Sequence, residues 1–94
     1  MAVEDLEAAY FELMMEEPGT TLEAFVDRVL AGTYGAQETE TVVTFLKRVE
    51  RMILGSIQTR ASSSAHAAAE AEDRAEEQQE LVARLVARVR GRDA

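Results

Sequence analysis

The chain has 94 residues, no cysteine and a formal net charge of −8. This length allows one small domain, and the lack of cysteine excludes disulfide bonds and thiolate metal sites. Unbroken apolar runs reach four residues at most, far fewer than the about 20 that span a membrane, and the first residues lack the basic and apolar regions of a secretory signal. We therefore expect a cytoplasmic protein.

A first amphipathic helix is predicted between Val3 and Met15. Its apolar residues recur at steps of three and four, which is helical spacing, and they are Val3, Leu6, Tyr10, Leu13 and Met14. Pro18 and Gly19 follow, and this pair is typical of a turn that ends a helix.

Two adjacent aromatic residues, Tyr10 and Phe11, cannot both face the core from this helix, because neighbouring helical positions point about 100° apart. We expect one of them to be at least partly exposed, and exposed aromatic residues are enriched at protein interfaces. Acidic residues lie close by. The predicted partner-binding surface consists of Tyr10, Phe11, Glu12, Glu16 and Glu17.

A second helix is predicted over residues 22–30. Thr20 and Glu23 have the spacing of a capping box in which Thr20 is the N-cap. Gly32 suits the left-handed position that follows many helices. Tyr34, in the short loop beyond, is placed to fold back over the core.

The chain beyond residue 37 has two possible architectures. No proline occurs between Glu38 and Arg90, and Gly55 is the only glycine there, so one continuous helix of about 50 residues is favoured. In the alternative, Ser62–Ser64 form a turn, because serine competes for backbone hydrogen bonds, and the chain doubles back as a helical hairpin. The alanines around these serines are good helix formers and count against the turn.

An apolar face runs along both halves of this segment. In the second half, three heptads place small or apolar residues at the positions that form a coiled-coil seam. Two short helices cannot cover a single helix of such length, so the seam predicts a homo-oligomer. The residues expected to carry self-association are Val42, Leu46, Val49, Ile53, Ile57, Ala68, Ala71, Ala75, Val82, Leu85 and Val89.

Charge changes sign along the chain in four blocks. Residues 1–40 have a net charge of −9, residues 41–60 of +3, residues 61–80 of −5 and residues 81–94 of +3. Alternating blocks favour docking of one segment on another, or on a second copy, in a fixed orientation. The acidic first block also indicates an alternative function, a regulatory inhibitor or adaptor that binds a basic groove on a partner protein.

Catalytic and metal-binding motifs are missing from the sequence. His66 is the only histidine, and Ser62 would be its neighbour on a helix surface without an oxyanion hole or pocket. The Glu-x-x-His spacing of helical di-metal sites is absent, since Ser63 stands three residues before His66. No phosphate-binding loop is present either. We expect no enzyme activity, cofactor or bound metal.

The last segment has an arginine-rich tail, formed by Arg84, Arg88, Arg90 and Arg92. A basic tail gives a second alternative function, a nucleic-acid-associated accessory protein. Two arguments weigh against it: the acidic first block would repel phosphates, and arginine near the end of a helix complements the helix dipole. Another protein is therefore the favoured partner, and nucleic acid is not.

The sequence thus predicts an all-α fold: two short N-terminal helices followed by a long C-terminal helix, in a helical-bundle or coiled-coil oligomer. It is one structural domain, with an acidic helix pair at 1–36 and a long helical segment, coiled-coil-like seam and arginine-rich tail at 37–94. The predicted function is non-enzymatic protein–protein interaction by a self-associating assembly or scaffold-type component.

Overall fold

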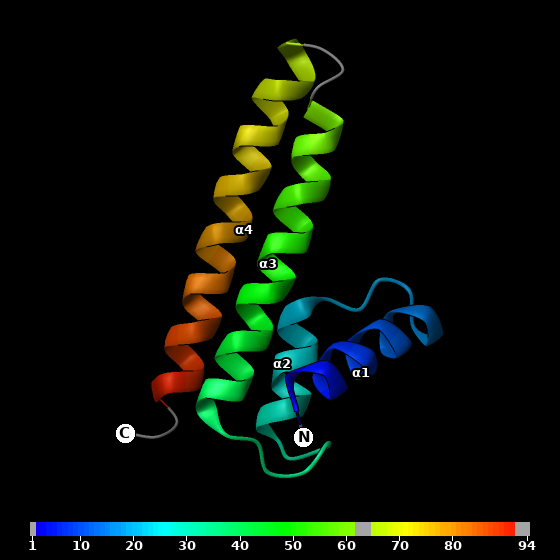
Figure 1. Ribbon diagram of the computed structural model, residues 1–94, viewed down its shortest axis with the longest axis vertical. Helices are drawn as coiled ribbons and strands as arrows, with labels where there is room; N and C mark the ends of the chain where they lie inside the picture. The colour runs from blue at the N-terminus through cyan, green and yellow to red at the C-terminus, as the bar shows by residue number, and fades with distance from the viewer. Residues whose placement is uncertain (1, 62–64, 92–94) are drawn as a thin grey trace.

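The computed structural model describes residues 2–61 and 65–91, which contain four helices and no strand. The helices are α1 (Val3–Glu16), α2 (Leu22–Leu30), α3 (Thr39–Ala61) and α4 (Ala65–Gly91). α3 and α4 lie antiparallel side by side, and the shorter α1 and α2 lie against one end of this pair, called the basal end here (Figure 1). The opposite end is called distal. The predicted all-α fold is confirmed.

The prediction of one continuous helix from Glu38 to Arg90 is wrong. α3 ends at Ala61, and a separate helix, α4, begins at Ala65. The alternative placed a turn at Ser62–Ser64, which lie outside the described residues. Burial of apolar surface explains why two helices form. When α4 packs beside α3, its apolar residues are shielded from water by the same chain. On one long helix, these residues would be shielded only if a second chain packed against them.

α2 spans the predicted residues 22–30, but its N-cap is not the predicted one. Its N-cap is Thr21, whose Oγ1 accepts a hydrogen bond of 3.1 Å from the Ala24 backbone N–H; the prediction of Thr20 as N-cap is therefore wrong. The Thr20 hydroxyl instead donates a hydrogen bond of 2.8 Å to the Glu17 carbonyl oxygen. Thr20 is thereby used in the turn after α1, and capping falls to Thr21.

A glycine ends α2, as predicted. Gly32 has a φ of +85°, a left-handed conformation that costs glycine little. Its N–H donates to the Val29 carbonyl oxygen, and the Thr33 N–H donates to that of Arg28, both at 3.1 Å. These two bonds form a Schellman motif, which satisfies carbonyl groups at the helix end and sends the chain back toward α3.

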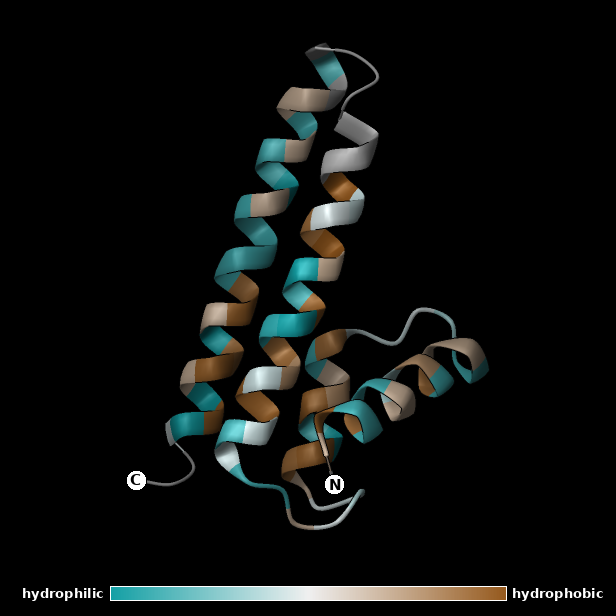
Figure 2. Cartoon of the chain, in the orientation of Figure 1, coloured by the Kyte–Doolittle hydropathy of each residue, from teal (hydrophilic) through white to brown (hydrophobic). Residues whose placement is uncertain are grey.

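The core lies at the basal end, where all four helices meet. Its buried apolar residues are Leu6, Tyr10 and Leu13 of α1, Leu22, Phe25, Val26 and Val29 of α2, Val42, Val43, Phe45, Leu46 and Val49 of α3, and Val82, Leu85 and Val89 of α4. Figure 2 shows hydrophobic residues along α2 and the basal half of α4, while the distal half of α4 is mainly hydrophilic. Among the described side chains, none beyond residue 49 of α3 or before residue 82 of α4 is fully buried.

Aromatic rings join three helices within this core. The ring centroids lie 5.2 Å apart for Tyr10 and Phe25, 5.4 Å for Phe25 and Phe45, and 5.8 Å for Tyr10 and Phe45. Such pairs contribute about 0.5–1.5 kcal/mol each beyond the area they bury. Tyr34 packs on Phe25 at 5.4 Å, so the expectation that it folds back over the core is confirmed.

Removing a buried aromatic ring should destabilise the fold more than removing an exposed one. Phe25→Ala removes a fully buried ring, so we expect a loss of about 3–5 kcal/mol in the free energy of unfolding. Phe11→Ala is the matched control, because the same atoms are removed from a ring that is 43% exposed, and its loss should be about 1 kcal/mol or less. Urea unfolding followed by circular dichroism measures both, and equal losses would contradict the assignment of Phe25 to the core.

Candidate functional site

Bulky apolar side chains gather on the outer side of α1. Phe11 is 43% exposed, Met14 41% and Met15 83%. They are three and four residues apart, so they share one stripe on the last two turns of the helix. Of the large hydrophobic residues that the structure describes, only Met52 of α3 joins them in the exposed class, at 43%. Phe11, Met14 and Met15 are called the α1 outer face below.

The opposite side of α1 explains this exposure. Leu6, Tyr10 and Leu13 face the core, and Tyr10 is only 6% exposed. With Tyr10 turned inward, the next residue, Phe11, has to point away from the core. The expectation that one of these two aromatic residues is partly exposed is confirmed.

Acidic residues border the α1 outer face. Glu12 and Glu16 are exposed, and within the described residues no ion pair engages either of them. Glu17 is different, since its Oε2 lies 3.1 Å from Nη2 of Arg28 on α2. The predicted partner-binding residues therefore divide into one buried ring, one exposed ring, two free carboxylates and one paired carboxylate.

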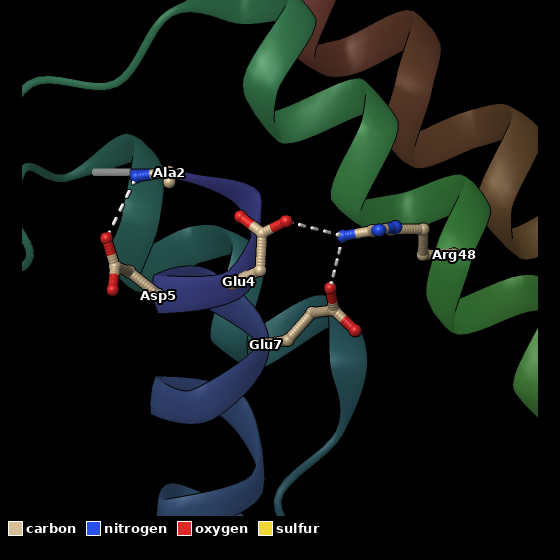
Figure 3. A network of polar contacts seen from close by, with 5 residues as sticks. All are labelled: Ala2, Glu4, Asp5, Glu7 and Arg48. Carbon is tan, nitrogen blue, oxygen red and sulfur yellow. Dashed lines mark hydrogen bonds and ion pairs between the residues drawn. The ribbon is translucent and has the colours of Figure 1, made fainter.

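Arg48 of α3 fixes the first two turns of α1. Its Nη1 donates hydrogen bonds to Oε1 of Glu7 at 2.7 Å and Oε1 of Glu4 at 3.5 Å (Figure 3). Asp5, on the same turns, accepts a hydrogen bond of 3.0 Å from the Ala2 N–H. Exposed ion pairs contribute at most about 1 kcal/mol each, so these contacts mainly orient α1. The α1 outer face occupies the two turns that follow.

The predicted self-association residues mostly pack within the chain. Six of them are buried in its own core: Val42, Leu46, Val49, Val82, Leu85 and Val89. Ile53, Ile57, Ala71 and Ala75 are half-buried, and Ala68 is exposed. The seam positions on α3 and α4 face each other because the two helices are neighbours. Their role between copies of the chain stays a prediction.

The arginine-rich tail is partly engaged by other helices. Arg88 forms an ion pair with Asp27 of α2, and Nη1 of Arg90 lies 2.9 Å from Oε1 of Glu40 on α3. Arg84 is exposed on α4, and Arg92 lies outside the described residues. Two of the four arginines thus hold the end of α4 to its neighbours.

A groove between α3 and α4 was not predicted from the sequence. Its volume is about 430 Å³. α3 contributes Lys47 and Glu50 to it, and α4 contributes Gln79, Val82, Ala83, Val86, Ala87 and Arg90. One sequence signal was available: Ala83, Val86 and Ala87 are spaced by three and four residues, a second apolar stripe beside the seam on α4.

His66, the residue considered above for catalysis and metal binding, lies on the surface of α4. Nε2 of His66 lies 3.1 Å from Oε1 of Glu70, and the His66 side chain is 87% exposed. Within residues 2–61 and 65–91, no group of three or more histidine, cysteine, aspartate or glutamate side chains is placed to hold a metal ion. Over the same residues, no helix combines the length and the apolar character that crossing a membrane requires.

Comparisons with protein-family models, with curated proteins and with solved structures give no match to this chain. The surfaces of the chain that bear on its function are the α1 outer face with its acidic border and the groove between α3 and α4.

Tyr10, the inward anchor of α1, should make stability depend on alkaline pH. Burial raises the pKa of its hydroxyl above the ordinary value, so the folded state keeps a proton that the unfolded state releases near pH 10. The stabilisation is complete below that pH and is lost as pH rises through the folded-state pKa.

Tyr10→Phe removes the titrating group, so we expect its free energy of unfolding to fall less steeply between about pH 9.5 and 11 than that of the unchanged protein. Urea unfolding at a series of pH values measures both slopes. Equal slopes would show that the Tyr10 hydroxyl is not buried in the folded state.

Proposed function

We propose that this protein is non-enzymatic and works by associating with other protein chains, copies of itself included, as a component of a helical assembly or scaffold. The α1 outer face is the observation that carries the proposal. Three bulky apolar side chains stay exposed there, although the same helix buries Leu6, Tyr10 and Leu13 on its other side.

The apolar character and polar rim of the α1 outer face support its assignment as a docking surface. Single exposed apolar residues are ordinary, but contiguous ones rimmed by polar groups mark interaction sites. Met15, which is 83% exposed, would contribute about 1.5–3 kcal/mol if association removed it fully from water, and Phe11 and Met14, which are less exposed, would contribute less. Met14 and Met15 add adaptability, because unbranched methionine side chains fit irregular partner surfaces.

A second candidate function is supported by the acidic border of this face. Glu12 and Glu16 carry charge that no basic group in the described residues offsets. A partner with a basic groove would therefore gain both apolar and electrostatic contacts at α1, as expected of an acidic regulatory inhibitor or adaptor. Exposed charge pairs are screened by salt, so such binding would weaken as salt is raised.

Self-association should depend on the most exposed residue of this face. We expect the unchanged protein to exceed its chain mass of 10.4 kDa and to gain mass with concentration. Met15→Gln keeps the length of the side chain and makes it polar, so it should weaken association at least about tenfold. Absolute mass from light scattering behind a sizing column, over a range of concentrations, measures both.

Met52→Gln is the matched control, because it makes the same change at the exposed methionine of α3. It should leave the concentration dependence of the mass unaltered. A constant mass of one chain at every concentration would contradict the proposal, as would an equal loss of association in the two variants.

A further inference from the structure

We propose that the α1 outer face of one copy docks into the groove between α3 and α4 of a second copy. The inference rests on the proposed self-association and names the two surfaces that meet. Its basis is that the chain carries an apolar face with an acidic border and, elsewhere, an apolar groove with Lys47 and Arg90 on its border against one carboxylate, Glu50.

The shapes of the two surfaces are complementary. Phe11 and Met15 project from α1 as long side chains. Ala83 and Ala87, exposed on α4, and Val86, half-buried beside them, line a groove of about 430 Å³. Short side chains in the groove leave room into which longer ones can pack.

The charges are complementary as well. The groove is lined by two basic residues, Lys47 and Arg90, and one acidic residue, Glu50, whereas the exposed carboxylates Glu12 and Glu16 border the α1 outer face. Lys47 lines the groove, and within the described residues it forms no ion pair. The carboxylates beside the α1 outer face, Glu12 and Glu16, are equally unpaired, so association would bring unpaired charges of opposite sign together.

The remaining charged groups of the groove orient the partner. Arg90 lies toward the basal end, and its Nη1 is held by Glu40 at 2.9 Å. Glu50 lies farther along α3 than Lys47, on the distal side. Acidic residues of a docking helix are therefore favoured near Lys47 and Arg90 and disfavoured near Glu50.

The two surfaces cannot meet within one chain. Arg48 of α3 binds α1, and the residue before it, Lys47, lines the groove. Adjacent helical positions point about 100° apart, so α1 and the groove lie on different sides of α3. The α1 outer face also points away from the core that α1 shares with α3. A second copy can offer its groove to the α1 outer face and its α1 outer face to the groove. Two copies that make both of these contacts would form a closed dimer.

Mixing two variants tests this pairing. Met15→Lys places a basic charge on the α1 outer face, which would meet the basic residues of the groove, and Ala83→Glu places an acidic charge in the groove, which would meet the acidic border of α1; both sites are exposed, and lysine and glutamate both suit a helix. Alone, each variant should self-associate roughly tenfold or more weakly than the unchanged protein. In an equimolar mixture, Ala83→Glu keeps an intact α1 outer face and Met15→Lys an intact groove, so a complex containing one copy of each should form.

Fluorescence anisotropy of labelled Met15→Lys, titrated with Ala83→Glu, measures that complex, and circular dichroism confirms that both variants are folded. Ala69→Glu, exposed elsewhere on α4, is the control and should self-associate normally. If the unchanged protein is a monomer, the proposed function itself fails. If it self-associates but Ala83→Glu does so equally well, or mixing restores nothing, the pairing of α1 with the groove is wrong and self-association stands.

Discussion

The contact among Tyr10, Phe25 and Phe45 joins α1, α2 and α3, with ring centroids 5.2–5.8 Å apart. This contact fixes the rotation of α1 about its own axis. Once Tyr10 packs inward, Phe11 has to lie outside, and Met15, four residues after Phe11, lies outside with it. The exposed surface that we assign to association is thus a consequence of how the core is packed. Arg48 reinforces the same orientation through Glu4 and Glu7.

The N-terminal half of the fold could be predicted because its boundaries are set locally. Pro18 and Gly19 stop α1, and Gly32 stops α2, through backbone conformations that few other residues allow. The choice between Thr20 and Thr21 as N-cap could not be made, since both hydroxyls suit the role and the turn after α1 decides between them. The C-terminal half has only a weaker signal of this kind, the serines at 62–64. Its alanines favour helix in any arrangement, and an apolar seam looks the same whether its partner is the same chain or another one.

The candidate site was predictable in part for similar reasons. Helical geometry requires either Tyr10 or Phe11 to be exposed, but only the packed core decides which. The seam residues Val82 and Leu85 were expected between copies, and the structure buries them against the chain's own helices. The groove was missed because it exists only when α3 lies beside α4, which puts Lys47 next to Ala83 and Val86. Surfaces made by two helices follow from tertiary packing and cannot be derived from either helix alone.

The central claim is that the α1 outer face is the surface by which copies of this chain associate, and methionine methyl groups report on it directly. In a dilution series with ¹³C-methyl-labelled methionine, assigned by substitution, the account predicts that the signals of Met14 and Met15 move with protein concentration. The signal of Met52, which is 43% exposed on α3, should keep its position. Signals of Met14 and Met15 that are independent of concentration, while the mass of the particle rises, would place the association surface elsewhere and contradict the account.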